Sequence, residues 1–402
     1  MKPLPRSLPE SAHGPASLRR DPMYRYLMVL TIAATMGLQA WRTLFDNFSV
    51  NVVGIDGDQM GVIQSVREIP GFLAALVVFV MLLLKEHRIS ALSVLTLALG
   101  LGATGLFPSF GGLIATTVVM SLGFHYYETT NQSLTLQYFD KKTAPLVFGR
   151  LRGIAAGSNI AIGVMIFFLV PYFSFTELYL LLGAMIAAMG LWGLSRNPSR
   201  DDVPVQRKKM IVRKRYWLYY LLTFLAGARR QIFVAFAVFL LVKKFGYTVQ
   251  EITTLFVINN VINYFLSPMI GRAIVRFGER KLLSVEYFSL IFVFLAYAVV
   301  ESKLLLAVLY IADHIFFNFA VAIRTFFQKI GDPGDIAPSM AVGFTINHIG
   351  AVVFPVMGGL MWMVDYRIPF VLAAILALMS LVFVQMITGQ VRRASEATSH
   401  SI

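Results

Sequence analysis

Long apolar stretches separated by short polar segments recur along the whole chain. A helix needs roughly 20 apolar residues to cross a bilayer, and most of these stretches reach that length. Strands of a membrane β-barrel would show shorter segments of alternating apolar and polar residues, which this chain does not show. We therefore predict an all-α membrane protein with twelve transmembrane helices in two six-helix bundles. The predicted helices lie approximately at residues 24–53, 58–84, 89–108, 112–138, 147–172, 176–195, 216–242, 251–275, 282–300, 304–328, 339–363 and 368–390.

The longest connection between two predicted helices is polar, basic and interrupted by proline, and it separates the first six helices from the last six. Composition and turn residues of this kind are typical of a loop. We predict five regions from this division: a cytoplasmic tail at 1–23, an N-terminal bundle at 24–195, a cytoplasmic linker at 196–215, a C-terminal bundle at 216–390 and a cytoplasmic tail at 391–402.

Composition agrees with a protein whose main partner is the lipid bilayer. Hydrophobic residues make up 57% of the chain and charged residues only 14%, whereas charged residues are about 25% of soluble domains. Most of the +14 net charge lies in alternate loops and in the tails. Such a distribution places both termini in the cytoplasm and the protein in the cell inner membrane. The charge is therefore not interpreted as a nucleic-acid surface, and the absence of cysteine excludes disulfides and thiolate metal sites.

Two stretches in the middle of predicted helices share one pattern. GLQAWRTLFDNFSV, which contains Arg42, lies in the first helix, and GARRQIFVAFAV, which contains Arg230, lies in the seventh. Charged residues inside membrane helices are costly and are functional candidates by default. Because the two helices are six apart, they run in the same direction, which indicates a parallel internal repeat. The repeat predicts one central site that both halves build.

The segment GRAIVRFGERK, residues 271–281, follows the eighth predicted helix. Gly271, Arg276 and Gly278, with the two basic residues at 280 and 281, resemble the loop signature of the major facilitator superfamily. Val275 and Glu279 depart from that signature. The resemblance implies two six-helix bundles around a solute site near the membrane midplane, which opens alternately to either side. It also implies that helices one, four, seven and ten line the cavity, while helices three, six, nine and twelve lie outside it.

Arg42 and Arg230 are our leading candidates for binding an anionic group, because a guanidinium presents several donors in a planar fork. Paired arginines on the first and seventh helices resemble the organophosphate antiporters of the superfamily. Asp46 is one turn after Arg42, so the alternative is an ion pair within that helix. Arg229 points about 100° away from Arg230. One of these two arginines is therefore predicted to be a structural partner of an acid on a neighbouring helix.

Further polar residues lie along the fourth and tenth predicted helices. His125, Glu128 and Gln132 form a stripe on one face of the fourth. With the two arginines, we assign to solute binding His125, Gln132, Asn318 and Arg324. We assign to proton coupling Asp46, Glu128, Asp313 and His314, since buried carboxyls and histidines can exchange protons near neutral pH. The alternative is that such pairs are purely structural. Glu286 is read as lying near the end of its helix.

A third group of residues is predicted to have structural or gating roles. Glycines at four-residue spacing allow two helices to approach closely, and a proline within a helix usually kinks it. Arg67 and Glu68 are interpreted either as solute contacts or as a charge pair that locks helices one and two together. This group comprises Arg67, Glu68, Gly149, Gly153, Gly157, Gly271, Arg276, Gly278 and Pro355.

No enzyme signature, ATP-binding loop or metal-ligand spacing is found, so we predict neither an enzyme nor a cofactor. The sequence favours a monomeric secondary active transporter that moves a small organic solute by alternating access, coupled to protons, with an anionic solute preferred. The first alternative is a proton-coupled exporter of hydrophobic or cationic compounds, whose cavity the 33 phenylalanines and 18 methionines could line. Against it, GIAAGSNIAIG lacks the proline of the drug exporters' fifth-helix motif. The second alternative is a membrane receptor or scaffold that transports nothing.

Overall fold

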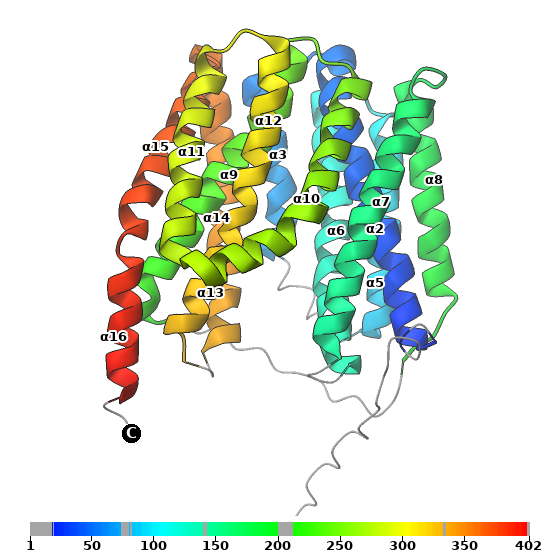
Figure 1. Cartoon of the computed structure of the whole chain (residues 1–402). Coiled ribbons are helices and arrows are strands. Elements are labelled where there is room, and N and C mark those ends of the chain that lie inside the picture. The colour runs from blue at the N-terminus through cyan, green and yellow to red at the C-terminus, as the bar shows by residue number, and fades with distance from the viewer. Residues whose placement is uncertain are drawn as a thin grey trace, which may run out of the picture.

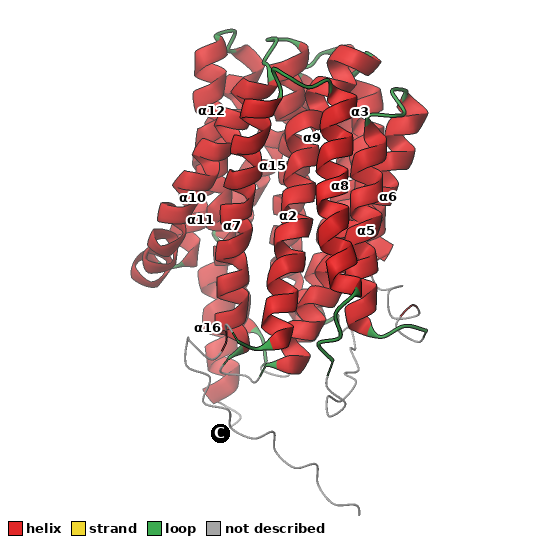
Figure 2. Cartoon of the chain, turned by 90° about the vertical axis from the view of Figure 1, so that its right-hand side faces the viewer, coloured by secondary structure: helices red, strands yellow, loops and turns green. Residues whose placement is uncertain are grey.

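The structure is a computed structural model that describes residues 18, 20–73, 80, 83–139, 143–199, 212–332 and 335–399. Within these ranges every regular element is a helix. Figure 1 and Figure 2 show the long helices side by side, with the loops gathered at the two ends of the molecule. Most of the predicted N-terminal tail and residues 200–211 of the predicted linker lie outside the described residues.

The described residues of the first half form six long α-helices, and the starts of these helices have a local cause. Asp21, Ser109 and Ser174 accept hydrogen bonds from backbone amides in the first turns of three of them, as good N-cap residues do. These helices are α2 (Pro22–Phe48), α3 (Gly57–Phe72), α5 (Glu86–Thr104), α6 (Phe110–Tyr138), α7 (Ala144–Leu169) and α8 (Phe175–Leu194), and a π-helical turn, Ser49–Val53, extends α2.

The second half follows a short 3₁₀ helix, Lys214–Tyr216, and its tenth predicted helix is broken. A 3₁₀ turn, Asn318–Ala320, separates α12 from α13, so the residues predicted as one helix form two. Part of the predicted C-terminal tail is helical, because α16 runs to Ser399. The helices are α9 (Trp217–Lys243), α10 (Val249–Phe277), α11 (Glu279–Val299), α12 (Lys303–Phe317), α13 (Val321–Ile330), α14 (Ile336–Val364), α15 (Ile368–Val384) and α16 (Ile387–Ser399).

Among the described residues, nine helices are long and apolar enough to cross a membrane, or ten if the bent α10 is counted as one span. The predicted all-α membrane fold is therefore confirmed. With α10 included, the count is two short of the twelve predicted crossings. The helix α3 is described over only 16 residues, and α6 carries the polar stripe that includes His125 and Gln132. The number of twelve crossings stays a prediction.

Two helix pairs make most of the contact between the first half and the second: α3 packs against α14, and α7 packs against α10. Smaller contacts join α2 to α9 and α10, and α3 to α9. A Cβ atom added to Gly61 of α3 would lie 2.3 Å from the Pro355 carbonyl oxygen of α14. Likewise, a Cβ on Gly359 would lie 2.6 Å from the Gly57 carbonyl oxygen. The backbones of α3 and α14 are thus in direct contact, and α14 continues through Pro355 as one helix.

An ion pair strengthens this contact at the end of the molecule opposite to the C-terminus (Figure 1). Lys243, the last residue of α9, lies 2.9 Å from a carboxylate oxygen of Asp56 and donates a hydrogen bond to the Ile55 carbonyl. Both partners belong to the segment that leads into α3. The two halves are therefore held together at this end, which we call the closed end.

The glycines at the start of α7 do not pack as the sequence predicted. A Cβ added to Gly149, Gly153 or Gly157 would meet no atom within 4 Å outside its own helix. Only further along α7 does the packing become close, where a Cβ on Gly163 would lie 3.2 Å from Val257 of α10. The helices α7 and α10 are thus in close contact toward the closed end, and the three glycines face open space.

The junction of α10 and α11 explains part of the predicted loop signature. Gly278 has a φ angle of 80°, a conformation that side chains beyond glycine rarely adopt. Arg276 lies over the Phe277 ring at 5.3 Å, while a Cβ on Gly271 would touch nothing. Between Leu266 and Met269, α10 bends by 49°.

Candidate functional site

Arg42, in the last third of α2, and Arg230, at the middle of α9, are solvent-exposed although their neighbours in the chain are buried. Trp41 is 1% exposed and Arg229 is fully buried. The charges of Arg42 and Arg230 are close enough to interact across the two halves. Within the described residues, neither arginine makes a hydrogen bond or an ion pair. The two matched arginines are thus exposed cations without a partner among the described residues, and they are close enough for their charges to interact.

The alternative ion pair between Arg42 and Asp46 is not formed. Asp46 is 9% exposed and has no ion-pair partner among the residues described. Its charge instead interacts with that of Arg67 on α3, and with the hydroxyl groups of Tyr179 and Tyr310. The carboxylate therefore does not neutralise Arg42, which leaves that guanidinium available to another anion.

Two of the other predicted solute-binding residues are also open to solvent. Arg324 on α13 and Gln132 on α6 are exposed, and neither has a hydrogen-bond or ion-pair partner in the part of the chain that the structure describes. Arg324 lies within electrostatic reach of Arg230. The site therefore holds a third unpaired cation.

Asn318 and His314 are engaged in helix packing rather than left open. The Asn318 side-chain amide donates to Asn263 of α10 at 2.5 Å and to the His314 carbonyl at 2.7 Å. The His314 ring packs against Tyr310 and Phe233, with ring centroids 4.8 and 5.3 Å away. Both residues line the contact between α12 and its neighbours.

Arg67 and Glu68 pair with each other and do not form the predicted charge pair between helices one and two. Nη2 of Arg67 donates to Glu68 at 2.7 Å, and its guanidinium lies over the Trp41 ring of α2 at 5.6 Å. On the other side, Nδ1 of His348 lies 3.3 Å from Glu68, without the alignment of a hydrogen bond. Because His348 belongs to α14, this buried cluster links the two halves.

The polar stripe of α6 reaches the same cluster. The rings of His125 and His348 meet edge to face, with centroids 5.4 Å apart. Glu128 lies 4.0 Å from the His125 ring and its side chain is 40% exposed. Glu128 is therefore accessible to water, as a residue that exchanges protons has to be, while His125 is 11% exposed and packed.

Arg229 is the structural partner that the sequence predicted for one of the two adjacent arginines. Its Nη2 donates to Glu286 of α11 at 2.9 Å, and both side chains are completely buried. Nη1 donates to Ser380 of α15 at 3.3 Å, and the guanidinium lies 4.7 Å over the Tyr287 ring. Glu286, which the sequence placed near the end of its helix, is the eighth residue of α11 and is completely buried.

Sequence reasoning missed three partners: Trp41 and His348 of the Arg67 and Glu68 cluster, and Glu286. A buried arginine needs a carboxylate partner, so Arg229 gave a signal for an acid but did not identify its helix. His348 gave no comparable signal. In the described residues no group of three histidines or acids could hold a metal ion.

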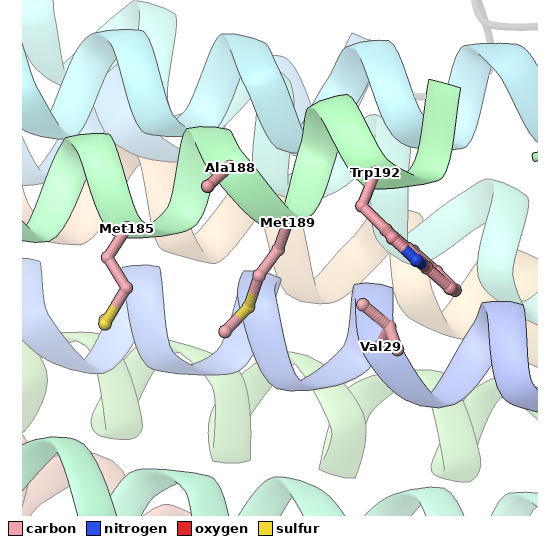
Figure 3. A pocket seen from close by; sticks show the side chains of 5 residues that line it. All are labelled: Val29, Met185, Ala188, Met189 and Trp192. Atoms are coloured by element: carbon pink, nitrogen blue, oxygen red, sulfur yellow. The ribbon is translucent and has the colours of Figure 1, made fainter. Parts of the chain in front are cut away.

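A separate groove of about 520 Å³ lies between α2 and α8. Its lining is apolar, and Figure 3 shows Val29 of α2 facing the side chains of α8. The groove is lined by Val29, Met185, Ala188, Met189 and Trp192. It contains none of the predicted site residues, so it is distinct from the arginine site.

Comparison with known proteins agrees with this architecture. Over 247 residues the chain is 24% identical to Multidrug resistance protein 1 of Bacillus subtilis (strain 168). That match covers 58% of this chain and 62% of the relative, so the chain spans less than two thirds of the relative's length. The identity is low, and the relative alone establishes no substrate.

Similar solved structures share the fold over nearly the whole chain. The nucleoside transporter NupG has a TM-score of 0.71 at 16% identity, and the match covers 92% of this chain and 98% of that one. An inward-facing bacterial homologue of the iron transporter ferroportin has a TM-score of 0.74 at 13% identity, covering 91% and 98%. An inward-facing, unoccupied bacterial homologue of the human lysosomal transporter Spinster has a TM-score of 0.72 at 13% identity, covering 93% and 98%.

A family comparison covers most of the chain. Residues 25–330 match the model of the Major Facilitator Superfamily. This match includes α2 to α13 and therefore both matched arginines. The similar structures are transporters of that type, which agrees with the absence of any enzyme signature in the sequence. The chain belongs to the Major Facilitator Superfamily, as its loop signature and its parallel repeat predicted.

Proposed function

We propose that this transporter moves a small organic anion across the cell inner membrane by alternating access, coupled to protons, with both termini in the cytoplasm. The observation that carries the proposal is the pair Arg42 and Arg230. Both are exposed in the interior, at matched positions of the two halves, and neither has a partner among the described residues. A carboxylate or phosphate group supplies the missing counter-charge.

The physical argument is electrostatic. Unpaired charges at membrane depth are costly, and two cations within reach of each other add repulsion to that cost. An anion that lies between Arg42 and Arg230 pairs with both charges and cancels their mutual repulsion. It also accepts charge-assisted hydrogen bonds, which are roughly twice as strong as neutral ones. Arg324 adds a third positive charge within reach of Arg230. The solute class that fits best is therefore an organic phosphate or a carboxylate.

The packing of the halves supports the alternating-access part of the proposal. At the closed end, α3 and α14 touch through Gly61 and Pro355, and Lys243 pairs with Asp56. Toward the other end, Gly149 to Gly157 of α7 have no close neighbour. This asymmetry is what a carrier open on one side requires, and positive residues in the loops favour the cytoplasm as that side.

The alternative is export of hydrophobic or cationic compounds, and one observation favours it: the relative from Bacillus subtilis is named a multidrug resistance protein. Lipophilic cations need acidic and aromatic groups in the site. Glu128 is a partly exposed acid near the site. Arg42, Arg230 and Arg324 are exposed and have no partner in the described part of the chain. The balance of charge therefore favours an anion.

The test is transport by the purified protein in liposomes, with a panel of organic phosphates, carboxylates and lipophilic cations. We expect uptake of at least one anion, which Arg42→Gln and Arg230→Gln each abolish. Arg88→Gln is the matched control, because it replaces an exposed arginine at the start of α5. We expect this variant to keep wild-type uptake. Uptake of cations alone, or anion uptake that survives both changes, would overturn the anion site. No flux of any solute would favour the receptor or scaffold.

A further inference from the structure

Asp313 of α12 is a buried carboxyl that the described structure leaves without a partner. Its side chain is completely buried, and neither carboxyl oxygen accepts or donates a hydrogen bond. A carboxylate in such a place loses its hydration and gains nothing in return, whereas the protonated acid has no net charge to desolvate. This position therefore suits a group that binds and releases a proton.

The packing between α9 and α12 brings Asp313 close to the arginine site. Phe233, one turn after Arg230, stacks on Tyr310 with ring centroids 5.3 Å apart. It also contacts the rings of His314 and Phe317 at 5.3 and 5.6 Å. Tyr310, His314 and Phe317 surround Asp313 along α12, so the Arg230 turn of α9 lies against the turn of α12 that carries the carboxyl.

Several charged and titratable groups face Asp313 from the neighbouring helices. They are Arg229 and Arg230 of α9, Glu286 and Tyr297 of α11, and Tyr310 of α12 itself. Arg229 is already paired with Glu286 at 2.9 Å. Arg230 is the unpaired cation in this group, and it is also the residue that we assign to the solute.

We propose that Asp313 binds a proton when an anion binds Arg230, so that anion and proton cross the membrane in the same direction. The inference rests on the proposed function in one respect, namely that Arg230 binds the solute. It singles out Asp313 from the four residues predicted to couple protons, and it adds the sign of the coupling.

The sign follows from the charge of Arg230. While Arg230 is free, its positive charge stabilises the Asp313 carboxylate. An anion at Arg230 cancels that charge, and the carboxylate then becomes less favourable relative to the protonated acid. By linkage, protonation of Asp313 in turn strengthens anion binding. One negative charge and one proton enter together, so the net charge of the buried region does not change.

The experiment measures the protonation of Asp313 without any solute. Infrared difference spectra of the purified protein, recorded from about pH 5 to about pH 10, follow the carbonyl stretch of buried protonated carboxyls. Asp313→Asn identifies the band by its loss. Arg230→Gln imitates the neutralised arginine. We expect the midpoint of the band to move to higher pH by about one unit in Arg230→Gln, and Arg230→Lys to restore the wild-type midpoint.

Arg324→Gln is the matched control, because it removes an exposed arginine of the same site that does not face Asp313. We expect its midpoint to equal that of the wild type. A band that persists at every pH, or that Asp313→Asn does not remove, would overturn the proposal, as would a midpoint that Arg230→Gln leaves in place. Because no anion is present, these results are independent of the transport test. Anion transport with no Asp313 response would refute only the proton site.

Discussion

Arg229 and Arg230 are adjacent in α9 but lie in opposite environments. Arg229 is completely buried and pairs with Glu286 at 2.9 Å, whereas Arg230 is exposed and has no partner among the described residues. Successive residues of a helix point about 100° apart, so one side chain enters the bundle when the other faces the space between the halves. The first arginine links α9 to α11 and α15, and the second is the one that we propose binds a solute.

The anion site predicts graded losses of affinity. A hydrogen bond to a charged group contributes about 1.5 to 3 kcal/mol, so Arg42→Gln and Arg230→Gln should each weaken anion binding by roughly tenfold or more. Arg42→Lys and Arg230→Lys should lose less, because they keep the charge but not the planar fork. The measurement is ligand-induced thermal stabilisation in detergent, where a bound anion raises the melting temperature. Equal stabilisation of all variants would contradict the site.

The buried ion pair of Arg229 and Glu286 predicts that substitutions there lower the stability of the protein rather than its affinity for solute. Removing one partner of a buried ion pair costs about 3 to 5 kcal/mol, because the other charge is left uncompensated. We therefore expect Arg229→Met and Glu286→Leu each to lower the melting temperature of the solubilised protein markedly. The double variant Arg229→Met with Glu286→Leu should recover much of that loss, since no unpaired charge remains. If the double variant lost as much melting temperature as the two single variants together, the instability would not come from an unpaired buried charge.

The closed end predicts a conformational effect of a small substitution. A side chain at Gly61 would collide with the backbone of α14, where the Pro355 carbonyl oxygen is 2.3 Å from the added Cβ. Gly61→Val should therefore separate α3 from α14 and abolish transport. The chain contains no cysteine, so pairs of introduced cysteines with spin labels can measure the separation directly. Gly111→Val, whose Cβ would meet nothing within 4 Å, serves as the control and should leave the distances unchanged.

The end of the linker predicts a pH dependence outside the membrane. Asp335, which precedes the membrane-spanning part of α14, has its pKa lowered below the ordinary value of 3.8, first because Arg213 donates hydrogen bonds to it. Tyr216 also donates to it, at 3.0 Å. A lowered pKa means that the contact stabilises the fold above the ordinary value and loses that effect as the pH falls toward the lowered one.

Asp335→Asn should therefore increase amide hydrogen exchange in the 3₁₀ helix Lys214–Tyr216 at neutral pH. In the wild type the same increase should begin only below about pH 4. Asp365→Asn, which removes an acid at the other end of α14, is the control. An increase that starts between neutral pH and about pH 6 would point to a different titrating group.

Most of the helices could be located from the sequence, and the reason is local. A membrane helix satisfies its own backbone and needs only a long apolar run, so each one is visible in its own segment. Even there, tertiary context decided some details: the tenth predicted helix is interrupted at Asn318, and α10 bends after Leu266. The sequence also marked Arg42 and Arg230 as candidates, because a charge inside an apolar run is costly wherever it is.

The choice of partners was decided only by the tertiary structure. Asp46 is one turn from Arg42 and yet does not pair with it. Glu68 on α3 instead lies close to His348 on α14, a helix far along the chain. Arg229 finds Glu286 in the same way. The sequence by itself determined that charges had to be accommodated within the membrane-spanning helices. Which of them are neutralised, and which remain open to a solute, depends on the rotation and packing of helices distant in sequence, which no local pattern contains.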